Sequence, residues 1–142
     1  MLLAAFSGVI AALLANITLF LINLTIPGPT INMPQLTVEI FLDVTEYTTI
    51  HQALGIIWST VVGSAYALFY LIALDLTGWH NLWLKAIIVI NPVWLLGAGF
   101  VMRIMELAVN IRHEPLAILA FFVAHLLFST YVYLLVNKYG KS

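Results

Sequence analysis

The sequence predicts an all-α integral membrane protein: a four-helix bundle with a short interfacial amphipathic helix between helices one and two. Of its 142 residues, 63% are hydrophobic types and only 8% are charged, and the apolar residues fall into four long runs. Soluble domains carry roughly 25% charged residues, and a membrane-spanning helix needs about 20 apolar residues. We therefore expect lipid to solvate most of the chain, which forms a single domain over residues 1–142.

The first apolar run covers residues 2–26 and contains no Lys or Arg. A secretory signal requires a basic segment before its apolar stretch, so we interpret this run as a retained spanning helix. At 1.5 Å per residue it measures roughly 38 Å, enough to cross a bilayer with some tilt. Pro27-Gly28-Pro29 ends it, because prolines interrupt the hydrogen-bond ladder of a helix.

A non-spanning stretch follows, residues 30–46, and it contains two faces at helical spacing. The apolar face consists of Leu36, Ile40 and Val44. The acidic face consists of Glu39, Asp43 and Glu46. This pattern predicts a short amphipathic helix over residues 35–46 at the membrane surface.

Three further spanning helices are predicted, over residues 48–74, 82–106 and 116–136. Pro92 lies near the middle of the third span, where a proline usually kinks a membrane helix. Trp79 and Trp83 follow the second span and mark an interface with water.

The few cations predict an orientation in the membrane. With four spans, Lys85, Lys138 and Lys141 share one side with both termini, whereas Arg103 and Arg112 lie on the other side. The positive-inside rule then places both termini in the cytoplasm, with the protein in the inner or plasma membrane.

Small residues recur at spacings of four, which lets helix backbones approach each other closely. Gly55, Ser59 and Gly63 form such a stripe on the second span, and Gly8 belongs to one on the first. These faces either hold the monomer together or dock onto a partner protein.

Four polar residues lie near the middle of their spans: Asn16, Thr60, Asn91 and His125. A polar or ionisable group at that depth is costly unless it finds a partner, so it marks a candidate site. His125 either fastens the bundle as a neutral imidazole bonded to an amide or hydroxyl, or forms the centre of a relay.

Metal and cofactor sites receive little support from the residues. His51, Glu46 and Glu106 are the candidate metal ligands, since imidazole and carboxylate bind divalent ions, but they lack an ordered spacing. A haem held by His51 and His125 would require equal depth, and the two differ by roughly 9 Å along the helices. We expect no metal, no cofactor and no catalytic site. The net charge of −1 also gives no reason to expect nucleic acid as a partner.

The chain resembles a broad class of uncharacterised four-helix prokaryotic membrane proteins. The resemblance rests on the small-residue first helix from Gly8, on His51 followed by a glycine-spaced run, on Asn91-Pro-Val-Trp and on Ala124-His125-Leu-Leu. It implies the fold and no activity.

Two functions remain open. The first is a non-catalytic accessory or structural subunit of a larger membrane complex, whose partners are the lipid bilayer and other membrane subunits. The alternative is a small transport or proton-relay module centred on His125 with Asn16 and Asn91.

Overall fold

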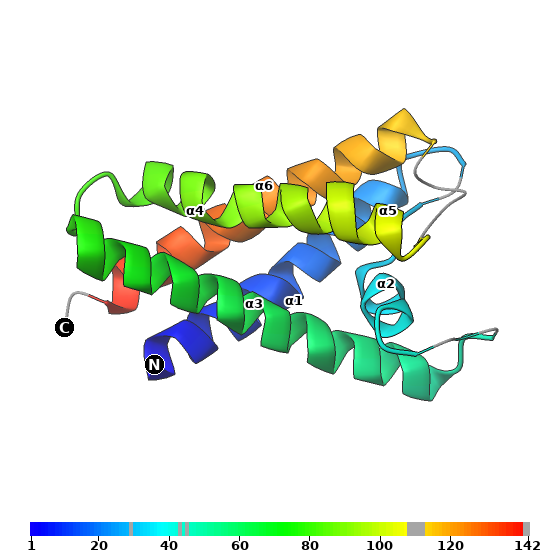
Figure 1. The fold of residues 1–142 in the computed structure, drawn as a ribbon, viewed down its shortest axis with the longest axis horizontal. Helices are drawn as coiled ribbons and strands as arrows, with labels where there is room; N and C mark the ends of the chain where they lie inside the picture. Colours follow the sequence, from blue (N-terminus) through cyan, green and yellow to red (C-terminus); the bar gives the residue numbers. More distant parts are fainter. Residues whose placement is uncertain (29, 43, 45, 108–112, 141–142) are drawn as a thin grey trace.

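The computed structural model describes residues 1–28, 30–42, 44, 46–107 and 113–140. Within these residues all regular structure is helical, and the chain forms an elongated bundle (Figure 1). In chain order the elements are α1 (Leu2–Asn23), α2 (Met33–Glu39), α3 (Thr49–Thr77), α4 (Leu82–Leu96), the π-helical turn η1 (Gly97–Val101), α5 (Met102–Ile104) and α6 (Pro115–Tyr139).

Four helical stretches are long and apolar enough to cross a membrane: α1, α3, the continuous stretch from α4 to α5, and α6. They pack together, with α1 against α3 and α6, and with α4 against the same two helices. The predicted fold class is therefore confirmed, including a short helix between the first two long ones. Helices of this kind make the chain an integral membrane protein in contact with lipid.

The ends of the long helices differ slightly from the predicted ones, for local reasons. α1 ends at Asn23 instead of residue 26, where the Asn23 Nδ2 donates to the Ile31 carbonyl oxygen at 2.7 Å and holds the turning chain. α3 continues past residue 74 to Thr77 and stops at Gly78, whose φ of 88° suits glycine.

The contact between α1 and α3 depends on small residues. Gly8 lies directly on the α3 backbone, since an added Cβ would be 2.5 Å from the Gly63 carbonyl oxygen. A Cβ at Gly63 would in turn be 2.8 Å from the Ala12 Cβ. Glycine at both positions therefore sets the distance between the two helices.

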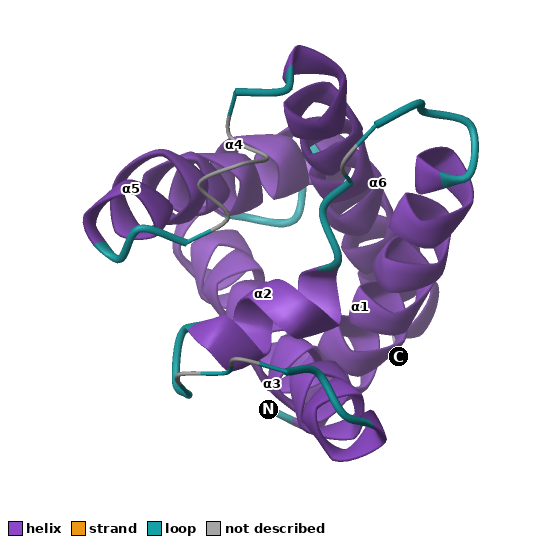
Figure 2. Ribbon diagram, turned by 90° about the vertical axis from the view of Figure 1, so that its right-hand side faces the viewer, coloured by secondary structure: helices purple, strands orange, loops and turns teal. Residues whose placement is uncertain are grey.

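The short helix α2 crosses one end of the bundle, in the space between the long helices (Figure 2). It begins earlier than predicted because Asn32 caps it, accepting from the Gln35 N–H at 3.3 Å, and because Pro34 suits its first turn. The Pro34 backbone rests on Gly55 of α3, where no Cβ could fit.

α2 also ends earlier than the predicted residue 46, at Glu39. Its buried residues Leu36 and Val38 point into the bundle. The Glu39 carboxylate accepts a hydrogen bond from the Tyr47 hydroxyl. This bond connects the end of α2 to the segment that leads into α3. Burial, followed by this hydrogen bond to Glu39, raises the pKa of Tyr47 to about 12. Asp43, predicted on the acidic face, lies outside the described residues.

The third span remains α-helical through Pro92, and its helical geometry changes only after Leu96. At Gly97–Val101 the hydrogen-bond ladder widens into the π turn η1. The span ends at Ile104, two residues before the predicted end at residue 106. Glu106 lies in the turn that follows and adopts a φ of 54°, a left-handed conformation that costs a non-glycine residue energy.

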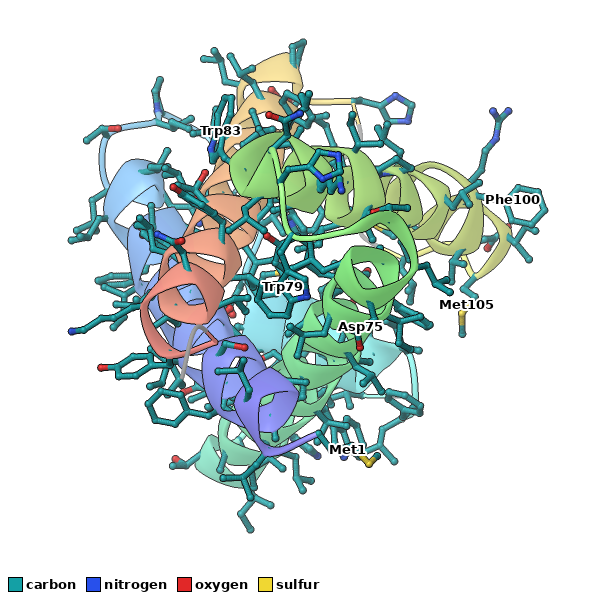
Figure 3. The ribbon with its side chains drawn as sticks, turned by 90° about the vertical axis from the view of Figure 1, so that its left-hand side faces the viewer. Met1, Asp75, Trp79, Trp83, Phe100 and Met105 are labelled. Carbon is teal, nitrogen blue, oxygen red and sulfur yellow. The ribbon has the colours of Figure 1, made fainter. Side chains whose placement is uncertain are left out.

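The core has two halves along the bundle. The half near the termini is closely packed by Ala4, Ala11, Ala67, Tyr70, Leu74, Ala86, Ile90, Val132 and Val136. Its outer end is covered by Trp79, which lies across the helix ends and packs on Gly140 (Figure 3). The half near α2 is built from Leu19, Leu36, Trp94, Met102, Phe121 and Ala124.

Candidate functional site

Asn16 connects α1 to α3. Its Nδ2 donates to the Ser59 Oγ at 3.0 Å, and the Ser59 hydroxyl donates in turn to the Ile56 carbonyl oxygen at 2.8 Å. The sequence identified Ser59 only as a small packing residue. Whether the Ser59 hydroxyl faces Asn16 depends on how α1 and α3 are rotated against each other.

Asn91 connects α4 to α6 in the same manner. Its Nδ2 donates to the Ser129 Oγ at 2.9 Å and to the Ile87 carbonyl oxygen at 3.1 Å. The Asn91 Oδ1 is buried and has no hydrogen-bond partner within the described residues. Ser129 was missed by the sequence reasoning, although its position four residues after His125 places it on the same face of α6.

His125 is buried on α6, with 7% of its surface exposed. Its Nδ1 lies 3.1 Å from the Phe121 carbonyl oxygen. A carbonyl oxygen can only accept, so Nδ1 carries the proton and a neutral ring presents a lone pair at Nε2. The Trp94 ring stacks on the imidazole with a centroid distance of 4.9 Å and a tilt of 34°.

The mid-membrane polar residues pair in different ways. Asn16 bonds Ser59 of α3, and the Thr60 hydroxyl donates to the Ile57 carbonyl oxygen of its own helix. Asn91 and His125 are linked through Ser129, whose hydroxyl accepts from the Asn91 Nδ2 at 2.9 Å and donates to the His125 carbonyl oxygen at 2.8 Å. The bundle nevertheless brings Asn16 and His125 to the walls of one cavity, whereas Asn91 and Thr60 do not line it.

That cavity, which we call the inner cavity, has a volume of about 170 Å³ and lies between α1, α2, α3, α4–η1 and α6. Most of its lining is aliphatic or aromatic. The polar residues among the lining are Asn16, Thr37, Ser59, Tyr66, Trp94 and His125. No Lys, Arg, Asp or Glu of the described chain lines it.

A second hollow, the outer cleft, lies between α4–η1–α5 and the start of α6 and has a volume of about 720 Å³. Its apolar part includes Leu95 and Ile118, and its rim carries Arg103, Glu106 and His113. Trp94, Met102 and Phe121 line both the inner cavity and the outer cleft. These three side chains therefore separate the two spaces.

The candidate metal ligands do not meet. His51 is used as a helix cap, with its Nδ1 accepting from the Thr48 backbone N–H at 3.2 Å. Glu46 and Glu106 are exposed, the latter at the far end of the third span. Among the residues that the structure describes, no three His, Asp or Glu side chains lie close enough together to hold a metal ion.

The predicted small-residue stripe of α3 contacts two different elements. Gly63 packs on α1 beside Gly8, and Gly55 packs on the backbone of α2. Ser59 lies between them and bonds Asn16. Two other glycines, Gly97 and Gly99, differ from these, since a Cβ added at either would meet no described atom within 4 Å.

Comparisons with protein-family models, with curated proteins and with solved structures found no match. The four long apolar helices support the four-span architecture that the resemblance implies.

Proposed function

We propose that the chain is a non-catalytic accessory subunit of a larger membrane complex, and that η1 receives one transmembrane helix of a partner protein. The supporting observation is the open backbone at Gly97 and Gly99. Glycine inside a helix costs roughly 0.5–1 kcal/mol relative to alanine. Gly8, Gly55 and Gly63 offset that cost with close contacts inside the chain, and Gly97 and Gly99 have no such contacts among the described residues.

The surroundings of η1 suit a helix in the membrane. Leu96 and Phe100 are 67% and 63% exposed, and Phe100 projects away from the other spans, as does Met105 (Figure 3). Exposed apolar side chains alone are normal for a surface that faces lipid. Gly99 is different, because it is exposed and its open backbone allows a neighbouring backbone to approach closely. Gly97 is half-buried and lines the inner cavity.

Mild extraction from the native membrane tests the proposal with two matched variants. Gly99→Leu fills the open backbone, and Ala65→Leu makes a comparable change on an exposed position of α3. We expect the wild type and Ala65→Leu to migrate in a complex with a second protein at fixed stoichiometry. Gly99→Leu should migrate alone with an unchanged melting temperature. A wild-type chain that migrates alone, or a Gly99→Leu chain that stays in the complex, would refute the proposal.

The alternative, a transport or proton-relay module centred on His125 with Asn16 and Asn91, draws support from the inner cavity, which reaches both His125 and Asn16. Against it stands the close packing of the half of the core near the termini. In proteoliposomes, a relay predicts a proton flux that His125→Phe abolishes. Equal flux in wild type and variant would exclude this alternative.

We also propose that both termini are cytoplasmic. Figure 1 shows the two chain ends and the α3–α4 turn at the same end of the bundle. Lys85 lies at this end, with its Nζ donating to the Gly78 carbonyl oxygen at 2.8 Å. The chain has no cysteine, so Asp75→Cys and Thr49→Cys can each be labelled alone in intact cells. An impermeant reagent should modify only the cysteine at position 49, and modification of position 75 would reverse the orientation.

A further inference from the structure

We propose that the inner cavity binds a neutral ring molecule that carries a hydroxyl group, and that this hydroxyl donates a hydrogen bond to the His125 Nε2. This inference goes beyond the subunit proposal and does not depend on it, because the ligand would bind at His125 of α6, whereas the partner helix would bind at the exposed Gly99 of η1. Three observations support it: the unpartnered acceptor, the size of the cavity and its position beside the outer cleft.

The acceptor is fixed by the backbone of α6. Because Nδ1 donates to the Phe121 carbonyl, the neutral ring offers only a lone pair at Nε2. Nε2 has no hydrogen-bond partner in the described part of the chain. It is also not among the fully covered unpaired polar atoms there, which are the Asn23 Oδ1, the Asn91 Oδ1 and the Trp94 Nε1. His125 lines the inner cavity, and we infer that its Nε2 opens into it. A ligand that pairs with Nε2 has to supply a donor.

Size and polarity define the rest of the ligand. A cavity of about 150 Å³ lined by apolar side chains accommodates benzene, and the inner cavity measures about 170 Å³. One six-membered ring with a small substituent therefore fills it. Trp94, Phe121 and Phe128 provide aromatic walls, which favour stacked or edge-on contact with a ring. A charged ligand would find no counter-ion among the lining residues.

Water is a poorer occupant than such a ring. A buried water needs two to four polar partners. The hydroxyls of Thr37 and Ser59 already donate to carbonyl oxygens of their own helices, at 2.6 and 2.8 Å. The cavity volume would hold about six waters at roughly 30 Å³ each, which is more than the remaining polar groups can satisfy.

The position of the cavity also suits a ligand that comes from the membrane. Toward the termini, the way is closed by the packed half of the core. Toward η1 and α6, the side chains of Trp94, Met102 and Phe121 lie between the cavity and the outer cleft. Methionine is flexible and adapts easily, so Met102 is the side chain we expect to move when a ring enters.

The test compares 4-fluorophenol with 4-fluorotoluene, which have similar shapes and differ in the hydroxyl group. Fluorine NMR of the full chain in lipid nanodiscs separates a saturable bound signal from the linear signal of ligand dissolved in lipid, which empty nanodiscs provide. We expect the phenol to bind about fivefold more tightly, the factor that corresponds to a net hydrogen bond of about 1 kcal/mol at 1.4 kcal/mol per factor of ten.

Three variants assign the signal to the cavity. His125→Phe should retain fluorotoluene binding and abolish the preference for the phenol. Ala124→Leu should fill the cavity and remove both signals, with Val62→Phe as a second filling variant if Ala124→Leu does not fold. Ala65→Leu should change neither. The absence of a saturable signal in the wild type, equal affinity for the two ligands, or a preference that survives in His125→Phe would overturn the proposal.

Discussion

Replacing Gly63 by leucine tests the closest approach between α1 and α3. A Cβ at this position would lie 2.8 Å from both the Ala12 Cβ and the Gly8 carbonyl oxygen, and 3.4 Å from the Phe128 ring. Carbon atoms pack best at about 3.5–4.0 Å. The two helices must therefore move apart by roughly 1 Å before the outer atoms of the leucine find any space.

The cost follows from how dispersion weakens with distance. A gap of 0.5–1 Å forfeits about a quarter to a half of each atomic contact, and α1 makes its most extensive contact with α3. Inserting bulk into a packed interior typically costs about 1–3 kcal/mol. Because a leucine adds four carbon atoms where even one does not fit, we expect a loss of about 2–3 kcal/mol.

Thermal unfolding in detergent measures this loss, with Ala65→Leu as the control on an exposed position of the same helix. A double variant sharpens the assay. Gly63→Ala introduces only the Cβ, and adding Ala12→Gly removes one of its two closest contacts, so the pair should recover part of the lost stability. If Gly63→Leu unfolds at the same temperature as Ala65→Leu, the contact does not hold α1 and α3 together and the reasoning fails.

Three smaller predictions concern single contacts. Ser59→Ala should lower stability by about 0.6 kcal/mol, the average for a hydrogen bond between membrane helices, and a loss as large as that of Gly63→Leu in the same melting assay would contradict this. Glu106→Gly should raise stability by up to about 1 kcal/mol by relieving the left-handed backbone, whereas Glu106→Ala should give no gain. Tyr47, whose pKa is raised to about 12 from the usual tyrosine value of about 10, should stabilise the α2–α3 connection fully below pH 10 and lose this effect as the pH rises through 12. In an ultraviolet titration, Tyr47→Phe should remove one phenolate from the late part of the curve, and an unchanged late part would contradict the raised pKa of Tyr47.

The number of spans could be predicted from the sequence because each span is a continuous apolar run, whichever way the helices pack against each other. The sequence is not sufficient for the partners of the buried polar groups. The helical period shows that Asn91 and His125 each lie on a face, but not how that face is rotated toward other helices. Ser129 and Ser59 became partners through that rotation, and hydroxyls of this kind occur on three of the four spans.

The short helix illustrates a second gap. The spacing of Leu36, Ile40 and Val44 indicated a helix in this stretch, but only Leu36 of the three lies within α2, and the ends of the helix depended on other signals. Asn32 and Pro34 start it, and the bond between Glu39 and Tyr47 follows its end. The π turn η1 was not predicted. Glycines in an apolar run are typical of close helix packing, whereas Gly97 and Gly99 have open space around them.

The contact between Pro34 and Gly55 has a consequence for the order in which the protein is made. α2 is translated before the helix it rests on, and at about 5–20 residues per second the ribosome needs seconds to complete α3. A helix of seven residues is not stable alone in water, and lipid offers no partners for its unpaired backbone groups. Residues 33–39 therefore have to wait, unfolded, at the membrane surface until α3 has inserted. This segment is therefore translated before α3 and folds after it.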